Sequence, residues 1–181
     1  MRNSKNLILV LSLLVSPFLK AQEIPVIEDR ETAIIEPLRL SGPRVGMSYV
    51  PQIKDFGLAE RFGDSTFNPN PYVAQFGWQF EWKYFETNGG SAGLFEVIPM
   101  IGGLDQGVII PSINFITGYR TAEGFEFGAG PNFSLLSTGF SAAAGYAFKS
   151  EHMYFPINFA VTKSRDGLRY SMIFGFSKRR R

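Results

Sequence analysis

Residues 74–84, AQFGWQFEWKY, place an aromatic ring at every second position from Phe76 to Tyr84. The residues that alternate with these rings are Gln75, Gly77, Gln79, Glu81 and Lys83. A period of two is the spacing of a β-strand, whose successive side chains point to opposite faces, whereas a helix would scatter the rings around its circumference. The stretch therefore predicts a strand with one aromatic face and one polar face.

The same alternation continues along most of the chain. It recurs in residues 44–50, 92–102, 109–120, 125–135, 140–149, 153–162 and 168–177. Most connectors are short and typical of hairpins, as in Gly89-Gly90 and Asp166-Gly167, and only 51–71 is long. None has room for the helix that a parallel crossover needs. We therefore predict eight consecutive antiparallel strands.

A closed barrel of this size has either an apolar interior, as in soluble carriers, or an apolar exterior, as in membranes. The polar face here is mostly Gly, Ser, Ala and Asn, which fit a narrow interior better than a surface in water. The apolar face of the seven later strands carries no charge, and a charge facing lipid costs about 2–4 kcal/mol near the bilayer midplane. The sequence thus predicts an all-β fold, a closed eight-stranded antiparallel up-and-down transmembrane β-barrel.

Pro131 conflicts with a regular ladder, because proline has no backbone N–H to donate and lipid supplies no substitute. Its place in the middle of the strand 125–135 predicts a bulge or bend near residues 128–131.

The N-terminus has the pattern of an export signal. Arg2 and Lys5 precede an apolar run, 7–19, that is too short to span a bilayer, and the small residue Ala21 follows. We predict a signal peptide over 1–21, cleaved after Ala21, then an acidic extended lead-in over 22–43, the barrel over 44–177 and a basic tail over 178–181.

Composition excludes several classes of function. The chain has 18 Lys and Arg against 16 Asp and Glu, so it lacks the basic excess of a nucleic-acid-binding protein. It has no cysteine and a single histidine, which excludes a disulfide framework, a thiolate zinc site and a cysteine nucleophile. We expect no cofactor, no metal and no nucleic-acid partner.

The architecture of residues 44–177 resembles the small eight-stranded outer-membrane barrels of Gram-negative bacteria, the OmpA/OmpX-like group. The final strand, with alternating apolar residues ending at Phe176, is similar to the C-terminal signal by which such barrels are recognised for insertion, although the basic tail continues beyond it. The resemblance implies an outer-membrane location, with outer-membrane lipid around the barrel, and no particular reaction.

An outer-membrane location with a periplasmic mature N-terminus returns the C-terminus to the periplasm after eight strands. Aromatic girdles are then expected at both interfaces. Near the periplasmic ends of the strands lie Trp82, Tyr84, Tyr119, Tyr146 and Phe148, and near the outer ends lie Tyr49, Tyr72 and Tyr170.

Charged residues on the polar face point into the barrel. The predicted ion-pair network comprises Arg44, Glu81, Lys83, Glu96, Arg120, Glu126 and Lys149 in the periplasmic half and Arg169 nearer the outside. Buried charges are costly unless they pair, so we expect these groups to fill the lumen as a plug. The alternative is a narrow porin-like channel for small polar solutes.

The leading hypothesis for function is a non-enzymatic structural element or an accessory subunit of an envelope complex, with other envelope proteins as partners. Its candidate partner surfaces are Phe56, Leu58, Phe62 and Phe67 in the long loop and Arg179, Arg180 and Arg181 in the tail. A lower alternative is an envelope-lipid-modifying enzyme. The only histidine, His152, falls in a predicted turn beside Ser150 and Glu151, and adjacency in a turn does not make a catalytic triad.

Overall fold

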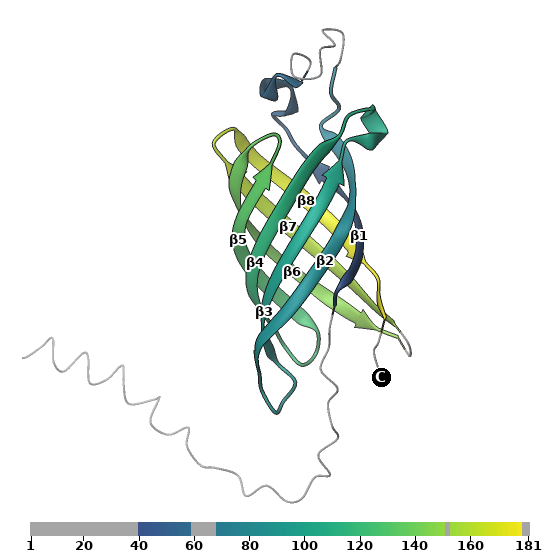
Figure 1. Ribbon diagram of the computed structural model, residues 1–181, viewed down its shortest axis with the longest axis vertical. Coiled ribbons are helices and arrows are strands. Elements are labelled where there is room, and N and C mark those ends of the chain that lie inside the picture. The colour runs from purple at the N-terminus through teal and green to yellow at the C-terminus, as the bar shows by residue number, and fades with distance from the viewer. Residues whose placement is uncertain (1–39, 59–67, 151–152, 179–181) are drawn as a thin grey trace, which may run out of the picture. The chain divides into compact units, whose positions relative to one another are not determined.

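Eight long antiparallel strands form a barrel in the computed structural model, which describes residues 40–58, 68–150 and 153–178 (Figure 1). They are β1 (Gly42–Tyr49), β2 (Tyr72–Glu86), β3 (Ala92–Gly102), β4 (Ile110–Arg120), β5 (Phe125–Ser134), β6 (Thr138–Lys149), β7 (Met153–Ser164) and β8 (Gly167–Gly175). Each strand pairs with the next, and β1 also pairs with β8, so the sheet closes on itself. The predicted all-β, closed, eight-stranded up-and-down barrel is confirmed.

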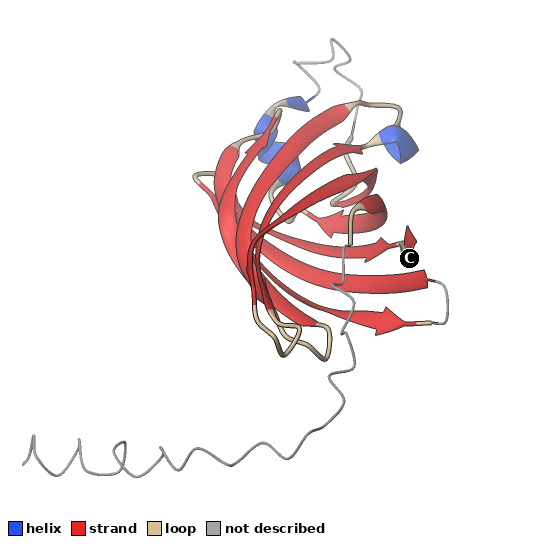
Figure 2. Cartoon of the chain, turned by 60° about the horizontal axis from the view of Figure 1, so that its bottom comes forward, coloured by secondary structure: helices blue, strands red, loops and turns tan. Residues whose placement is uncertain are grey.

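The two ends of the barrel differ in how they are built. One end, called the loop end below, carries the described connector residues 50–58, 68–71, 103–109, 135–137 and 165–166, with the short helices η2 (Ile53–Phe56) and η3 (Leu104–Gln106) (Figure 2). The opposite end, called the terminal end, carries the turns 87–91 and 121–124, the end of β6, the start of β1 and the end of β8. A two-residue strand, β9 (Ser177–Lys178), pairs there with Met153 and Tyr154 of β7. In the described part of the chain no helix has the length and apolarity to cross a membrane.

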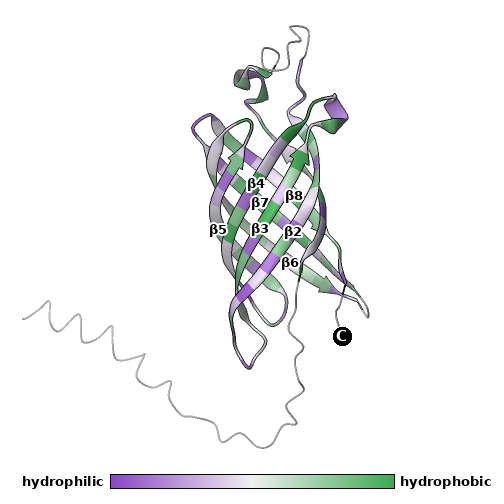
Figure 3. Cartoon of the chain, in the orientation of Figure 1, coloured by the Kyte–Doolittle hydropathy of each residue, from purple (hydrophilic) through white to green (hydrophobic). Residues whose placement is uncertain are grey.

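Because the pattern has a period of two, the aromatic rings point outward and the polar groups point inward. On β2, Trp78 is 47% and Phe80 is 44% exposed, whereas the alternating residues Gln79 and Glu81 are 0% and 9% exposed. Hydrophobic and hydrophilic residues alternate in the same way along the other strands (Figure 3). The barrel thus buries polar side chains and exposes apolar ones, the reverse of a soluble barrel.

Of the bulge or bend predicted near residues 128–131, the bulge is wrong. The β5–β6 pairing runs in one register through Pro131, which lies opposite Phe140. Pairing with β4 lapses at Gly130 and Pro131 but resumes unshifted on both sides. Because only one edge of a strand loses a donor at proline, the strand accommodates Pro131 without an extra residue. The register shift lies instead between Lys83 and Phe85 of β2.

The described residues all belong to one compact unit. The predicted signal peptide, the lead-in up to residue 39 and the tail from 179 onward lie outside the described residues. β1 begins at Gly42, two residues before the start that the alternation indicates, and the last strand is broken at Phe176 into β8 and β9.

Candidate functional site

The interior near the terminal end holds a cluster of buried charges centred on Arg120 of β4. Its guanidinium Nη2 lies 2.5 Å from Oε2 of Glu81 and 2.7 Å from Oε2 of Glu126, and its Nη1 donates to Oε1 of Glu81 at 3.0 Å. Glu96 Oε1 is 3.7 Å from the same Nη2. Arg120 is only 2% exposed, so these pairs form away from water. There, geometry and hydrogen bonding decide how much an ion pair contributes to stability.

Strand register explains why this arginine is needed. Glu81 of β2 and Glu96 of β3 lie directly opposite each other, an arrangement in which like charges repel. Arg120 is in turn the register partner of Glu126 on β5. Its planar guanidinium therefore reaches carboxylates from both sides and offsets their repulsion.

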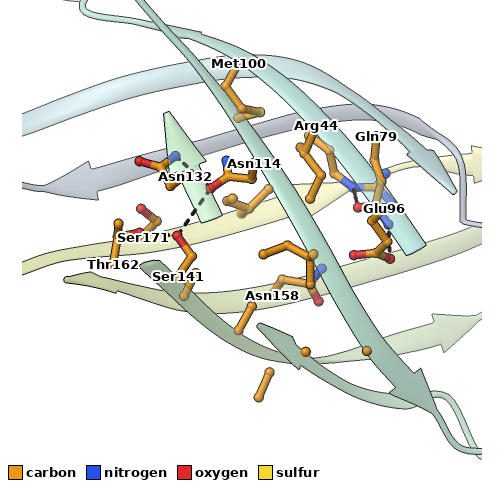
Figure 4. A pocket seen from close by; sticks show the side chains of 18 of the residues that line it. Arg44, Gln79, Glu96, Met100, Asn114, Asn132, Ser141, Asn158, Thr162 and Ser171 are labelled. Carbon is orange, nitrogen blue, oxygen red and sulfur yellow. Dashed lines mark hydrogen bonds between the residues drawn. The ribbon is translucent and has the colours of Figure 1, made fainter. Parts of the chain in front are cut away.

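Arg44 of β1 joins the cluster through an amide rather than directly. Its Nε donates to Gln79 Oε1 at 2.8 Å, and Gln79 Nε2 donates to Glu96 Oε1 at 2.6 Å (Figure 4). The guanidinium lies over Gly175 of β8, where an added Cβ would come within 2.7 Å of Arg44 Cζ. The absence of a side chain at Gly175 thus leaves the space that the Arg44 guanidinium occupies.

The chain just before β1 closes the terminal end. Leu40 is fully buried with Ala147 and Tyr154. Its N–H donates to Glu81 Oε2 at 3.3 Å, its carbonyl accepts from Arg44 Nη2, and the Glu81 N–H donates to Ser41 Oγ at 3.0 Å. Leu40 is therefore tied to the charge cluster as well as packed beneath it.

Nearer the loop end, uncharged polar side chains form a second network, in which Asn114 Oδ1 accepts from Asn132 Nδ2 at 2.8 Å and from Ser141 Oγ at 3.3 Å. Ser141 and Thr162 share a hydrogen bond of 2.7 Å. Arg169 of β8 donates through Nη2 to Asn132 Oδ1.

Between the charge cluster and this polar network lies a cavity of about 60 Å³ (Figure 4). Ile98, Met100 and Ile116 from β3 and β4 form an apolar wall on one side of it. Polar groups from β5 to β8 line other parts, including Asn132, Ser141, Thr162 and Ser171. The cavity is therefore amphipathic.

Apolar side chains close the loop end. The segment after β1 contributes Val50, Ile53 and Leu58, with Phe56 partly buried beside them. They pack against residues of the barrel mouth, namely Val73, Val108, Ile110 and Leu136. We call residues 50–58 the lid. A smaller cavity of about 10 Å³ lies between Gln52 and Phe56 of the lid and Arg169.

The structure brings together five of the eight charges predicted to form a network: Arg44, Glu81, Glu96, Arg120 and Glu126. Lys83 instead pairs with Glu86 at 3.5 Å, and Lys149 is exposed at the end of β6. Arg169 stands apart, in contact with Asn132. The bridging Gln79, the buried Leu40 and the apolar wall were not anticipated, because single polar or apolar residues give no periodic signal of such contacts.

The predicted girdle residues lie on the outside of the barrel. Tyr49 is the register partner of both Tyr72 and Tyr170, so three tyrosines form a row near the loop end. Near the terminal end, Trp82, Tyr84, Tyr146 and Phe148 are 40–59% exposed. Tyr119 is only partly exposed, because Phe85 and Phe127 flank its ring at centroid distances of 6.2 and 6.0 Å.

The expected partner surface in the long loop is not present where the structure describes it. Leu58 is 2% exposed and Phe56 packs against the same apolar cluster, since both serve the lid. Phe62, Phe67, His152 and Arg179, Arg180 and Arg181 lie outside the described residues.

Comparison of the chain with protein families, with curated proteins and with solved structures gave no match. Among the described residues, no group of three or more potential ligands is placed to hold a metal ion. Evidence about function therefore comes from the barrel itself.

Proposed function

We propose that the chain is an integral outer-membrane β-barrel, non-enzymatic, with a closed, ion-pair-filled interior, and that it serves as a structural element or accessory subunit of the envelope. The observation that carries the proposal is the inverted distribution of side chains. Rings such as Phe76 and Trp78 are about half exposed, while Arg44 and Arg120 are 1% and 2% exposed. Soluble monomers rarely expose contiguous apolar surface beyond a few hundred Å².

The height of the apolar band supports a bilayer as its solvent. Tyr72 of the loop-end row and Trp82 of the terminal-end row are ten residue steps apart on β2. At about 3.3 Å per residue and a tilt of about 40°, these steps span about 25 Å along the barrel axis, the height of the apolar band in known membrane barrels. Between the rows, no outward position of the described strands carries a charge.

The first outward charge beyond the loop-end row, Lys163, lies where the proposed apolar band ends. Lys163 lies two residues past Val161, the register partner of Tyr170, in the direction of the loop end. A lysine at this level reaches the headgroup region with its ammonium while its methylenes stay against the barrel.

The closed interior favours a structural role over a channel. Leu40 is packed inside the terminal end and the lid is packed against the mouth at the loop end, so we expect an open pore to require both to move. The carboxylates of Glu81 and Glu126 are engaged by Arg120, which argues against acid–base chemistry by these two groups. The cavity between the two ends is the specific observation in favour of the channel alternative.

Reconstitution tests the proposal. The purified chain, without residues 1–21, is folded into phosphatidylcholine vesicles and analysed by heat-modifiable migration on gels, then by planar-bilayer recording. We expect a compact, heat-modifiable form with no steady unit conductance. Stable unit conductance supports the channel alternative, and failure to partition into vesicles contradicts the membrane proposal. Native purification then separates the two structural roles, because an accessory subunit co-elutes with a stoichiometric partner.

A further inference from the structure

Among the described interior arginines, Arg169 is the one that no hydrogen-bonded link joins to a carboxylate. Arg44 also lacks a direct ion pair, but Gln79 connects it to Glu96. Arg169 lies on β8 and points inward beside Asn132, its acceptor. No carboxylate of the described residues lies within the 4.0 Å of an ion pair with it, in contrast to Arg120. A guanidinium has five N–H donors, and one accepting amide leaves most of them without a described protein acceptor.

The interior carboxylates are engaged elsewhere. Glu81 and Glu126 bind Arg120, and Glu96 binds Gln79. Along β8, Arg169 is six residues from Gly175, the residue that the Arg44 guanidinium covers. Six residues of strand extend about 20 Å. The charge cluster therefore does not supply the counter-ion for Arg169.

The groups around Arg169 are held in place by one another. Ser48 and Ser171 share a hydrogen bond of 2.6 Å, Ser141 and Thr162 share one of 2.7 Å, and Asn132 is fixed by Asn114 and Arg169. These polar groups are paired, whereas Arg169 keeps unused donors; Asn158 Oδ1, on the same cavity, also has no hydrogen-bond partner. Such a fixed surround is a preorganised site for an acceptor.

Both cavities border Arg169. The larger one, about 60 Å³, lies on the interior side, and the smaller one lies on the lid side. Since about 10–15 Å³ of such volume holds one water molecule, the larger one has room for about four to six non-hydrogen atoms. Its apolar wall of Ile98, Met100 and Ile116 favours a methyl or ethyl group opposite the polar side.

We propose that the interior cavity binds a small monocarboxylate, with the carboxylate on the Arg169 guanidinium and a short alkyl group against Ile98, Met100 and Ile116. A planar carboxylate matches the guanidinium fork, which a spherical ion does not, and it compensates a charge that is costly to bury alone. The lid side is the entry, because the smaller cavity places Gln52 and Phe56 next to Arg169.

The test uses the full mature chain folded in non-ionic detergent micelles and sodium [¹³C]acetate as the probe. Broadening of the acetate resonance at constant ionic strength gives the dissociation constant. Arg169→Gln is expected to raise it about ten- to hundredfold, the loss of a charge-assisted hydrogen-bonded pair. The matched control is Arg165→Gln, an exposed arginine in the neighbouring turn, which leaves the constant unchanged.

The size of the ligand and the carboxylates of the segment 59–67 provide two further tests. Acetate and propionate are expected to bind, whereas hexanoate exceeds the cavity and binds at least tenfold more weakly. The Glu60→Gln/Asp64→Asn double variant, which removes two carboxylates outside the described residues, keeps the acetate response.

Three results overturn the proposal. The first is an acetate resonance that the wild-type chain does not broaden, and the second is an unchanged acetate dissociation constant in an Arg169→Gln variant that still folds, as judged by heat-modifiable migration. The third is hexanoate that binds as tightly as acetate. If Arg169→Gln does not fold, Arg169→Lys takes its place. Lysine keeps the charge but lacks the fork, so weaker acetate binding supports the site and undiminished binding contradicts it.

Discussion

Arg120 determines whether the interior near the terminal end is stable. Three acidic side chains, Glu81, Glu96 and Glu126, approach one another there, and Arg120 touches all three. A buried ion pair often adds little net stability over an apolar replacement, but removal of one partner leaves uncompensated charge. Arg120 is thus important mainly because its removal would leave buried carboxylates without a counter-ion.

Arg120→Met is expected to destabilise the folded barrel by about 3–5 kcal/mol, because Glu81 and Glu126 lose their counter-ion while still buried. Urea unfolding from lipid vesicles measures the change. Lys83→Met is the matched control, since Lys83 forms a single, partly exposed pair with Glu86, and such pairs contribute at most about 1 kcal/mol. Equal effects of the two substitutions would contradict the account of the cluster.

The lid and the chain before β1 are the two elements that turn an open barrel into a closed one. Ile53 in η2 is 1% exposed and Leu40 is 0% exposed, values typical of a protein core rather than of a surface loop. The barrel ends thus hold ordinary hydrophobic packing, whereas the middle holds polar networks beside a small apolar wall. Closure therefore depends on apolar contacts that can be weakened one at a time.

Ile53→Ala is expected to weaken lid packing by about 2–5 kcal/mol, the usual cost of a buried Ile-to-Ala change. We then expect trypsin to cleave after Lys54 in η2, because the loosened segment can enter the protease, whereas we expect the packed lid to resist cleavage there in the wild type. Ile109→Ala, at a loop-end residue that is 58% exposed, serves as control and leaves Lys54 protected. Rapid cleavage after Lys54 in the wild type would show that the lid does not close the mouth.

The strands were predictable because period-two alternation is a local property, and the burial of Gln79 between exposed Trp78 and Phe80 follows from it. The inward direction of Arg120 and Glu126 follows from the same parity, and hairpin register then makes them partners. Lid packing by Ile53 was not predictable, since it depends on contacts with Val108 and Leu136, far away in sequence.

Pro131 is a second case in which the local sequence was not enough to predict the structure. Its chemistry correctly indicates a missing donor, but whether a strand bulges depends on which neighbour loses the bond. Here the loss falls on the β4 side, while the β5–β6 register continues.

Taken as a whole, the barrel exposes apolar side chains and buries polar ones, the distribution that the proposed membrane location requires. The effect of an outward charge at mid-height therefore distinguishes a barrel surrounded by lipid from a barrel surrounded by water. Phe76→Arg is expected to lower the free energy of unfolding by about 2–4 kcal/mol, and Tyr72→Arg, in the loop-end row, by about 0–1 kcal/mol. Equilibrium unfolding in vesicles measures both. In a barrel surrounded by water, the arginine at 76 would be neutral or would improve solubility.

The most direct measurement uses the two tryptophans, Trp78 and Trp82, which are both outward on β2 and 47% and 53% exposed. Trp82→Phe and Trp78→Phe each leave a single tryptophan, whose fluorescence is quenched in vesicles of lipids brominated at defined depths. We predict that Trp78 is quenched most by bromine deep in the acyl chains and Trp82 by bromine nearer the headgroups. Quenching of neither tryptophan, or of both equally by a water-soluble quencher, would contradict a membrane-spanning barrel.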